Sequence, residues 1–73
     1  MNKIEIIGGI YIRYINVQKN FEIPNDFKIR IINSLVYQLE EEKEECDVFC
    51  EYIINKIVHD MIDYRKVLLR GGM

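Results

Sequence analysis

The sequence predicts an α+β fold, in which an N-terminal β-hairpin packs on two amphipathic α-helices and dimerisation completes the core. Three observations support this prediction. β-branched and aromatic residues fill two short runs near the N-terminus, proline and glycine are absent from residues 27–70, and a chain of only 73 residues is 49% hydrophobic. We interpret residues 1–73 as a single small domain, with a β-hairpin region at 1–23 and a helical region at 25–70.

The predicted hairpin consists of residues 3–7 and 10–17, which are separated by two glycines. A Gly-Gly pair supplies the positive φ angles that a two-residue hairpin turn requires. Residues 21–23 leave room for a third short strand, because the residue before a proline prefers an extended backbone. A helix over residues 10–21 is the competing interpretation, and the dominance of β-branched side chains favours strands instead. The residues that match helical spacing there are Ile10, Tyr14, Val17 and Phe21.

The helical region is predicted to begin at Asn25 or Asp26, whose side chains can accept the free amides of a helix N-terminus. Residues 25–70 can form one helix or two, and the acidic stretch at 40–47 decides between them. An unbroken rod would be about 65 Å long and hard for so short a chain to cover. Asp47 suits the N-cap of a new helix, so we favour two helices.

The end of the helical region carries a cap signal. Arg70 is followed by Gly71 and Gly72. Glycine readily takes the left-handed conformation that ends many helices, and a basic side chain suits the negative end of the helix dipole. The last helix is therefore predicted to end at Arg70.

A second subunit is expected because the core of one chain is small. A domain of this length buries only about 60% of the surface that its unfolded chain exposes, and two cysteines are too few for a disulfide framework. The second helical portion carries apolar residues at spacings of three and four, which is typical of a core helix that also touches a neighbour. The predicted dimer interface is Cys50, Ile54, Ile57, Met61, Tyr64 and Leu68.

Charge is unevenly distributed along the chain. The net charge is −2, but residues 40–51 carry seven acidic residues and one basic residue, while both flanking segments have a basic excess. An acidic chain is a poor match for general nucleic-acid binding. No apolar run reaches the roughly 18 residues that a membrane-spanning helix needs, and the N-terminus lacks a leader pattern. We therefore expect a cytoplasmic protein.

The candidate chemical groups are few. Cys46 and Cys50 lie four residues apart on one predicted helix face, and we interpret them as a boundary thiol and a core residue. His59 and Asp63 share the same spacing without a nucleophile nearby, which is typical of a solvated helix face. We expect no enzyme activity, no cofactor and no metal, because no nucleophile, base and orienting group can be assembled.

Binding is the remaining class of function. We expect a small regulatory or adaptor protein that acts by protein–protein binding, such as the inhibitors, anti-repressors and antitoxins that phages and plasmids encode. The partner is expected to be a protein, with a basic contact surface, because tyrosines are frequent interface anchors and clustered carboxylates attract basic surfaces. The predicted partner-binding residues are Tyr11, Tyr14, Phe21, Tyr37, Tyr52, Glu41, Glu42, Glu44 and Glu45.

Two alternatives belong to other classes. A strand followed by two helices is similar to the outline of ribbon-helix-helix proteins, and this resemblance implies a dimeric DNA-binding regulator. Its positive surface would consist of Lys3, Arg13, Lys19, Lys28 and Arg30. The second alternative is a thiol or zinc sensor. A zinc site would combine Cys46 and Cys50 from two subunits as four thiolates, and a thiol sensor would use redox switching or an intermolecular disulfide.

Overall fold

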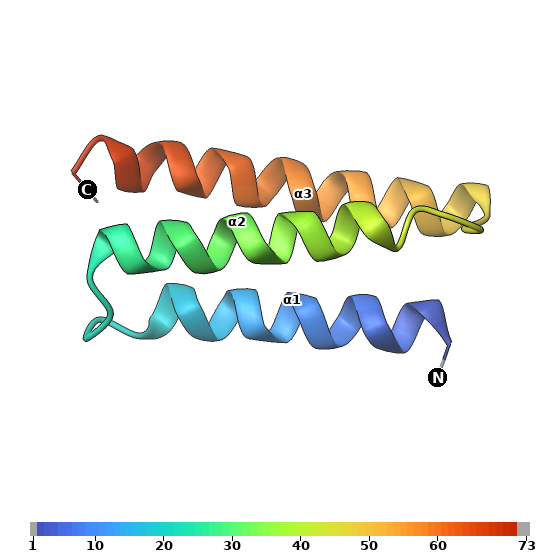
Figure 1. Ribbon diagram of the computed structural model, residues 1–73, viewed down its shortest axis with the longest axis horizontal. Coiled ribbons are helices and arrows are strands. Elements are labelled where there is room, and N and C mark those ends of the chain that lie inside the picture. Colours follow the sequence, from blue (N-terminus) through green and yellow to red (C-terminus); the bar gives the residue numbers. More distant parts are fainter. Residues whose placement is uncertain (1, 72–73) are drawn as a thin grey trace.

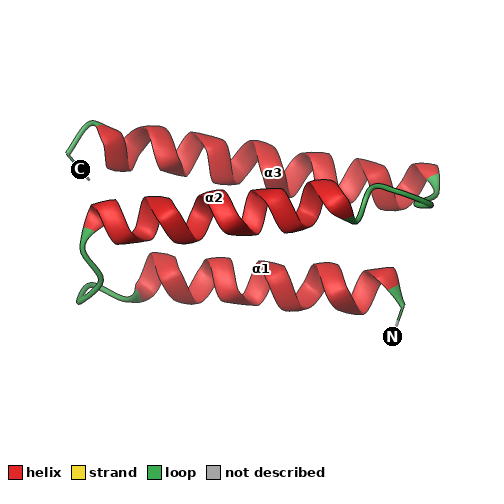
Figure 2. Ribbon diagram, viewed as in Figure 1, coloured by secondary structure: helices red, strands yellow, loops and turns green. Residues whose placement is uncertain are grey.

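The computed structural model describes residues 2–71, which form three α-helices and no β-strand. Helix α1 spans Lys3–Lys19, α2 spans Asn25–Glu41 and α3 spans Val48–Leu69. The helices run side by side along the long axis of the molecule, each antiparallel to the one before it (Figures 1 and 2). The α+β prediction is therefore wrong, and the fold is a three-helix bundle.

The predicted N-terminal hairpin and its optional third strand are replaced by helix α1 and a loop. Residues 3–7 and 10–17 both lie in α1, and residues 21–23 lie in the α1–α2 connection. The two glycines continue the helix instead of forming a turn. Helix formation wins because it gathers four side chains into one buried stripe, which outweighs the strand preference of β-branched residues. The members of this stripe are Ile7, Ile10, Tyr14 and Val17.

The start of α1 has a capping signal that the strand interpretation missed. The Asn2 side chain accepts a hydrogen bond from the backbone amide of Glu5 at 2.9 Å. The Glu5 carboxylate lies in the first helical turn, where a negative charge suits the helix dipole. An N-cap with an acid three residues later is the sequence pattern of a helix start.

The division of the helical region into two helices is confirmed. Helix α2 begins at Asn25, directly after Pro24, although no side chain caps it. Asp47 is the N-cap of α3 and accepts a hydrogen bond from the amide of Cys50 at 2.8 Å. Gly71 follows α3 with a φ of 106°, as the cap pattern predicts, and Gly72 lies outside the described residues.

A single core is shared by all three helices. Its fully enclosed centre is formed by Tyr14, Ile32, Leu39, Ile54 and Met61. Helix α1 supplies the cover that the sequence interpretation assigned to a sheet and a second subunit. Within residues 2–71, no helix combines the length and apolarity that crossing a membrane requires.

Replacing Asp47 with alanine is expected to lower the free energy of unfolding by about 1 kcal/mol, because the first turn of α3 loses its side-chain acceptor. Asn25→Ala is the matched control, since Asn25 starts a helix that has no side-chain capping bond. Urea unfolding of both variants measures the difference. Equal stability of the two variants would show that the Asp47 cap contributes nothing.

Candidate protein-binding surfaces

The junction of α1 and α3 is held by a partly buried polar contact between a core tyrosine and an exposed aspartate. The Tyr14 side chain has no exposed surface, and its hydroxyl donates to the Asp60 carboxylate at 2.6 Å. The Tyr14 ring also packs edge-on against Tyr64, with ring centroids 5.9 Å apart, and the Tyr64 hydroxyl accepts from the Lys28 ammonium at 3.5 Å. Tyr14 therefore fixes the lateral register of α1 against α3, and Lys28 links α2 to the same cluster.

Burial, followed by the hydrogen bond to Asp60, raises the pKa of Tyr14 well above its usual value of 10.0. The folded chain therefore keeps the phenolic proton at a pH where the unfolded chain loses it. This contribution to stability is complete below about pH 10 and is lost as the pH rises towards the folded-state pKa.

Tyr14→Phe is expected to lower the free energy of unfolding by about 1 kcal/mol at neutral pH, because the hydrogen bond to Asp60 is lost. Between pH 10 and about 12, this variant should lose less stability than the parent, because the titrating group has been removed. Urea unfolding at neutral pH and in this alkaline range measures the free energy of unfolding. Tyr37→Phe, on the exposed side of α2, is the control. An alkaline loss of stability equal to that of the parent would contradict the role assigned to Tyr14.

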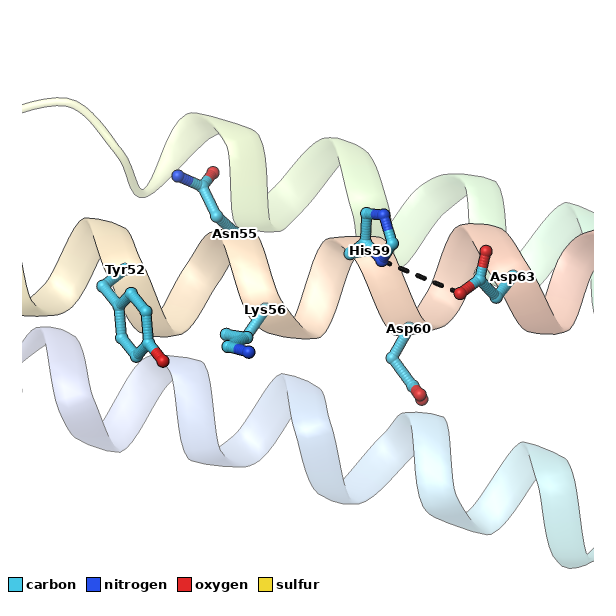
Figure 3. Close-up of a pocket in the computed structure, with 6 residues that line it drawn as sticks. All are labelled: Tyr52, Asn55, Lys56, His59, Asp60 and Asp63. Carbon is cyan, nitrogen blue, oxygen red and sulfur yellow. Dashed lines mark ion pairs between the residues drawn. The ribbon is translucent and has the colours of Figure 1, made fainter.

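A shallow groove of about 300 Å³ lies outside this junction and is lined by Tyr11 from α1 and by Lys56, Ile57 and Asp60 from α3. A wider hollow of about 410 Å³ adjoins it on the exposed side of α3, and Figure 3 shows its six lining residues. The Lys56 ammonium lies 5.6 Å from the centre of the Tyr52 ring, and His59 pairs with Asp63 at 3.7 Å. The surface here is aromatic and carries both signs of charge.

Exposed residues of α3 form a continuous stripe along this surface. They follow one another at spacings of three or four residues, so they share one side of the helix. We call this set the outer α3 stripe: Phe49, Tyr52, Lys56, Asp60, Asp63 and Val67. The stripe lies beside α1, because Lys56 and Asp60 line the groove together with Tyr11.

The acidic stretch at 40–47 comprises the last two residues of α2 and the α2–α3 connection, at one end of the bundle (Figure 1). Glu42 accepts from the Lys3 ammonium at 3.0 Å, and Glu40 pairs with Lys43 at 3.3 Å. The hydrogen bond to Glu42 raises the pKa of Lys3. The carboxylates of Glu44 and Glu45 are exposed, and neither takes part in an ion pair within residues 2–71.

We call a group of four exposed side chains the acidic end. It combines three carboxylates with an aliphatic residue that starts α3 and is 84% exposed. Its members are Glu41, Glu44, Glu45 and Val48. Sequence reasoning included the three glutamates but missed Val48, because a single exposed valine has no periodic signal of its own.

The predicted aromatic anchors do not form one surface. Tyr11 and Tyr52 lie along the α1–α3 side, while Phe21 is 94% exposed in the α1–α2 connection at the opposite end. Tyr37 is exposed on α2. Tyr14 is enclosed in the core, so it cannot serve as an accessible anchor in the folded chain. The sequence interpretation assigned Tyr11, Tyr14 and Phe21 to a sheet, which the structure replaces with α1 and the α1–α2 connection.

The stripe predicted as a dimer interface points into the bundle. Four of its residues, Cys50, Ile54, Met61 and Leu68, are buried within the single chain. The other two, Ile57 and Tyr64, are partly buried against the same core. Their spacing correctly indicates a packed helix face, but the neighbours that cover it are α1 and α2 of the same chain.

The two cysteines are unpaired thiols. Cys50 lies in the first turn of α3, but Cys46 lies in the connection before it, so the predicted shared helix face is wrong. Burial, with a hydrogen bond to Cys50 and the nearby Asp47 carboxylate, raises the pKa of the Cys46 thiol to about 11. A thiol with such a pKa is a weak nucleophile at neutral pH. Residues 2–71 hold no group of three or more His, Cys, Asp or Glu side chains placed to hold a metal ion.

The outline on which the DNA-binding alternative depended is wrong, because the described residues contain no strand to enter a DNA groove. Its positive surface is also divided. Lys28 is only 6% exposed, and the Arg13 guanidinium donates to Gln38 at 3.0 Å. The part of the chain that the structure describes therefore has no paired-strand reading element of the ribbon-helix-helix type.

Comparison of the chain with protein-family models, with curated proteins and with solved structures found no match.

Proposed function

We propose that this protein is a small regulatory protein that acts by binding another protein, and that the acidic end makes the contact. The supporting observation is the combination of three exposed carboxylates with the exposed Val48 side chain at one end of the bundle. An apolar contact beside carboxylates suits a partner with an apolar pocket and a basic rim. Inhibitors, anti-repressors and antitoxins are the types of regulator that this mode of action suits.

The backbone at the acidic end supports a role for its charges. Glu45 has a φ of 59°, a left-handed conformation that costs a residue with a Cβ atom about 1 kcal/mol and that glycine would adopt freely. Backbone strain at a residue with a side chain is a reason to look for a function at that position. The carboxylate of Glu45 is exposed, so it is free to meet a partner.

The test is affinity capture from a lysate of the source cells with two charge-reversed variants. The first carries Glu44→Lys and Glu45→Lys at the acidic end. The matched control carries Glu22→Lys and Asp26→Lys, two exposed positions at the opposite end of the bundle. We expect the first variant to capture about tenfold less protein than the parent, which corresponds to a loss of about 1.4 kcal/mol of binding free energy. The control variant should capture as much as the parent.

Both variants must first show the helical content of the parent. Capture of the same proteins in the same amounts by the parent and the acidic-end variant would contradict the proposal. Loss of capture by the control variant alone would place the contact at the opposite end, near Phe21, and would also contradict it.

A further inference from the structure

The outer α3 stripe is a surface that the proposed function does not use. It runs from Phe49 to Val67, which is about 27 Å of helix at 1.5 Å per residue. Its two ends are apolar, and Phe49 is 66% exposed. Between the ends lie one cation and two carboxylates, in the order Lys56, Asp60 and Asp63. A stripe with exposed apolar ends and separated charges of both signs is suited to packing against another helix.

The order of the residues along the stripe makes it complementary to a second copy of the same stripe that runs in the opposite direction. If two copies pack α3 against α3 in antiparallel fashion, with a two-fold axis at the level of Val58, Lys56 of one copy meets Asp60 of the other. Phe49 then meets Val67 of the second copy, which is an apolar pair. Every contact occurs twice, as a two-fold interface requires.

The remaining pair is also complementary. Tyr52 of one copy falls opposite position 64 of the second copy, one residue from Asp63, and a phenol hydroxyl can donate to a carboxylate within its reach. Asp60 has two carboxylate oxygens, and only Oδ2 is used by the Tyr14 hydroxyl in the hydrogen bonds of residues 2–71. A carboxylate oxygen therefore remains for the ammonium group of the second copy.

Lys56 is available for such a contact within one chain. The three ion pairs found in residues 2–71 do not include it, although Asp60 lies one turn away on the same helix. Its ammonium instead lies over the Tyr52 ring. Lys56 and Asp63 are seven residues apart, which is too far for their side chains to pair within one helix. An attraction between these two charges would therefore indicate a contact between two copies.

We propose that the outer α3 stripe is a homodimer interface in which a second copy of this chain packs antiparallel across α3. This interface differs in location and residues from the α3 stripe that the sequence predicts, which is buried in the monomer. It shares no residue with the acidic end, although Phe49 directly follows Val48. The charge changes at Lys56 and Asp63 leave the acidic end intact, so the two proposals can fail independently. Tyr11 on α1 lies at the edge of the interface.

The test uses opposite charge changes in two variants of the full chain. Lys56→Glu places a carboxylate opposite Asp60 and Asp63 of the second copy, and Asp63→Lys places a second cation near Lys56 of the second copy. Asp63 is chosen because Asp60 holds Tyr14 in the core. Each variant alone should dimerise at least about tenfold more weakly than the parent, and an equimolar mixture should recover a heterodimer, because the charges of the two variants attract.

Native mass spectrometry over a dilution series measures all of these species and separates the heterodimer from either homodimer by mass. Lys66→Glu is the matched control, because it makes the same charge change on the exposed surface of α3 outside the stripe, and it should dimerise like the parent. Phe49→Ser tests the apolar end without changing charge and should also weaken the dimer.

Four results would overturn the proposal. The first is a parent chain that stays monomeric at about 100 µM, a concentration at which even a weak specific dimer forms. The second is a dimer that neither Lys56→Glu nor Phe49→Ser weakens. The third is a mixture of the two charge variants that forms no more dimer than either alone, and the fourth is equal weakening by Lys66→Glu. None of these results would affect capture of a basic partner by the acidic end.

Discussion

Replacing Ile54 with alanine is expected to lower the free energy of unfolding by about 3 kcal/mol. Ile54 has no exposed surface and lies in the core that all three helices share. Removing its side-chain carbons loses burial energy and leaves a cavity, and such changes typically cost about 2–5 kcal/mol. Because a small domain is stable by only about 5 kcal/mol or a little more, this one change should remove most of its stability.

The matched control for this prediction is Ile12→Ala, because Ile12 is 61% exposed on α1. Its removal should change the stability by less than about 0.5 kcal/mol. Urea unfolding followed by circular dichroism measures both variants against the parent. A similar loss in both would mean that Ile12 is as buried as Ile54, which the three-helix arrangement does not allow.

Replacing Gly8 and Gly9 together with alanine is expected to raise the free energy of unfolding by about 1–2 kcal/mol. Each glycine lies inside α1, where alanine is preferred by about 0.5–1 kcal/mol because glycine loses more backbone freedom on folding. An added Cβ atom at either position meets nothing within 4 Å. The gain should therefore not be offset by a steric clash.

Gly71 provides the opposite control within the same chain. It has a φ of 106°, a conformation that strains any residue with a Cβ atom, so Gly71→Ala should lower the stability by about 1 kcal/mol. Thermal unfolding of Gly71→Ala and of the double variant at Gly8 and Gly9 measures whether each change raises or lowers the stability of the parent. If the double variant at Gly8 and Gly9 were destabilised, these glycines would have to occupy a turn with positive φ.

Sequence reasoning failed at the N-terminus because the local signals there favour the wrong structure. Locally, β-branched residues around a Gly-Gly pair favour a hairpin, and no helix propensity argument overrides that preference. The decisive contribution is tertiary, because Tyr14 gains its partner Asp60 only when α1 packs against α3. The capping pair of Asn2 and Glu5 was the one local signal of a helix start.

The second half of the fold was predictable because local and tertiary preferences agree there. Asp47 caps α3, and the absence of proline and glycine between residues 27 and 70 is consistent with two helices. The apolar stripe from Cys50 to Leu68 was correctly identified as a packed face. Its covering element was not predictable, since covering it requires α1, which had been interpreted as strands.

One of the two candidate surfaces could be found largely from the sequence, and the other required the structure. The three glutamates of the acidic end could be found from the sequence alone, because clustered charge stays at the surface, but Val48 could not. The outer α3 stripe could not, because Lys56 and Asp63 are ordinary polar residues until one knows which side of α3 meets the rest of the chain. Phe49 and Val67 were passed over for the same reason, although their spacing from Lys56 was a usable signal.

The most direct test of the three-helix bundle is NMR of the uniformly labelled chain. We expect helical Cα chemical shifts throughout residues 3–19 and cross-relaxation between the rings of Tyr14 and Tyr64, whose centroids lie 5.9 Å apart. These two results together would establish that α1 is a helix and that it packs on α3. Extended shifts on both sides of Gly8 and Gly9, with cross-relaxation between Ile6 and Tyr11, would instead show a hairpin and would contradict the bundle.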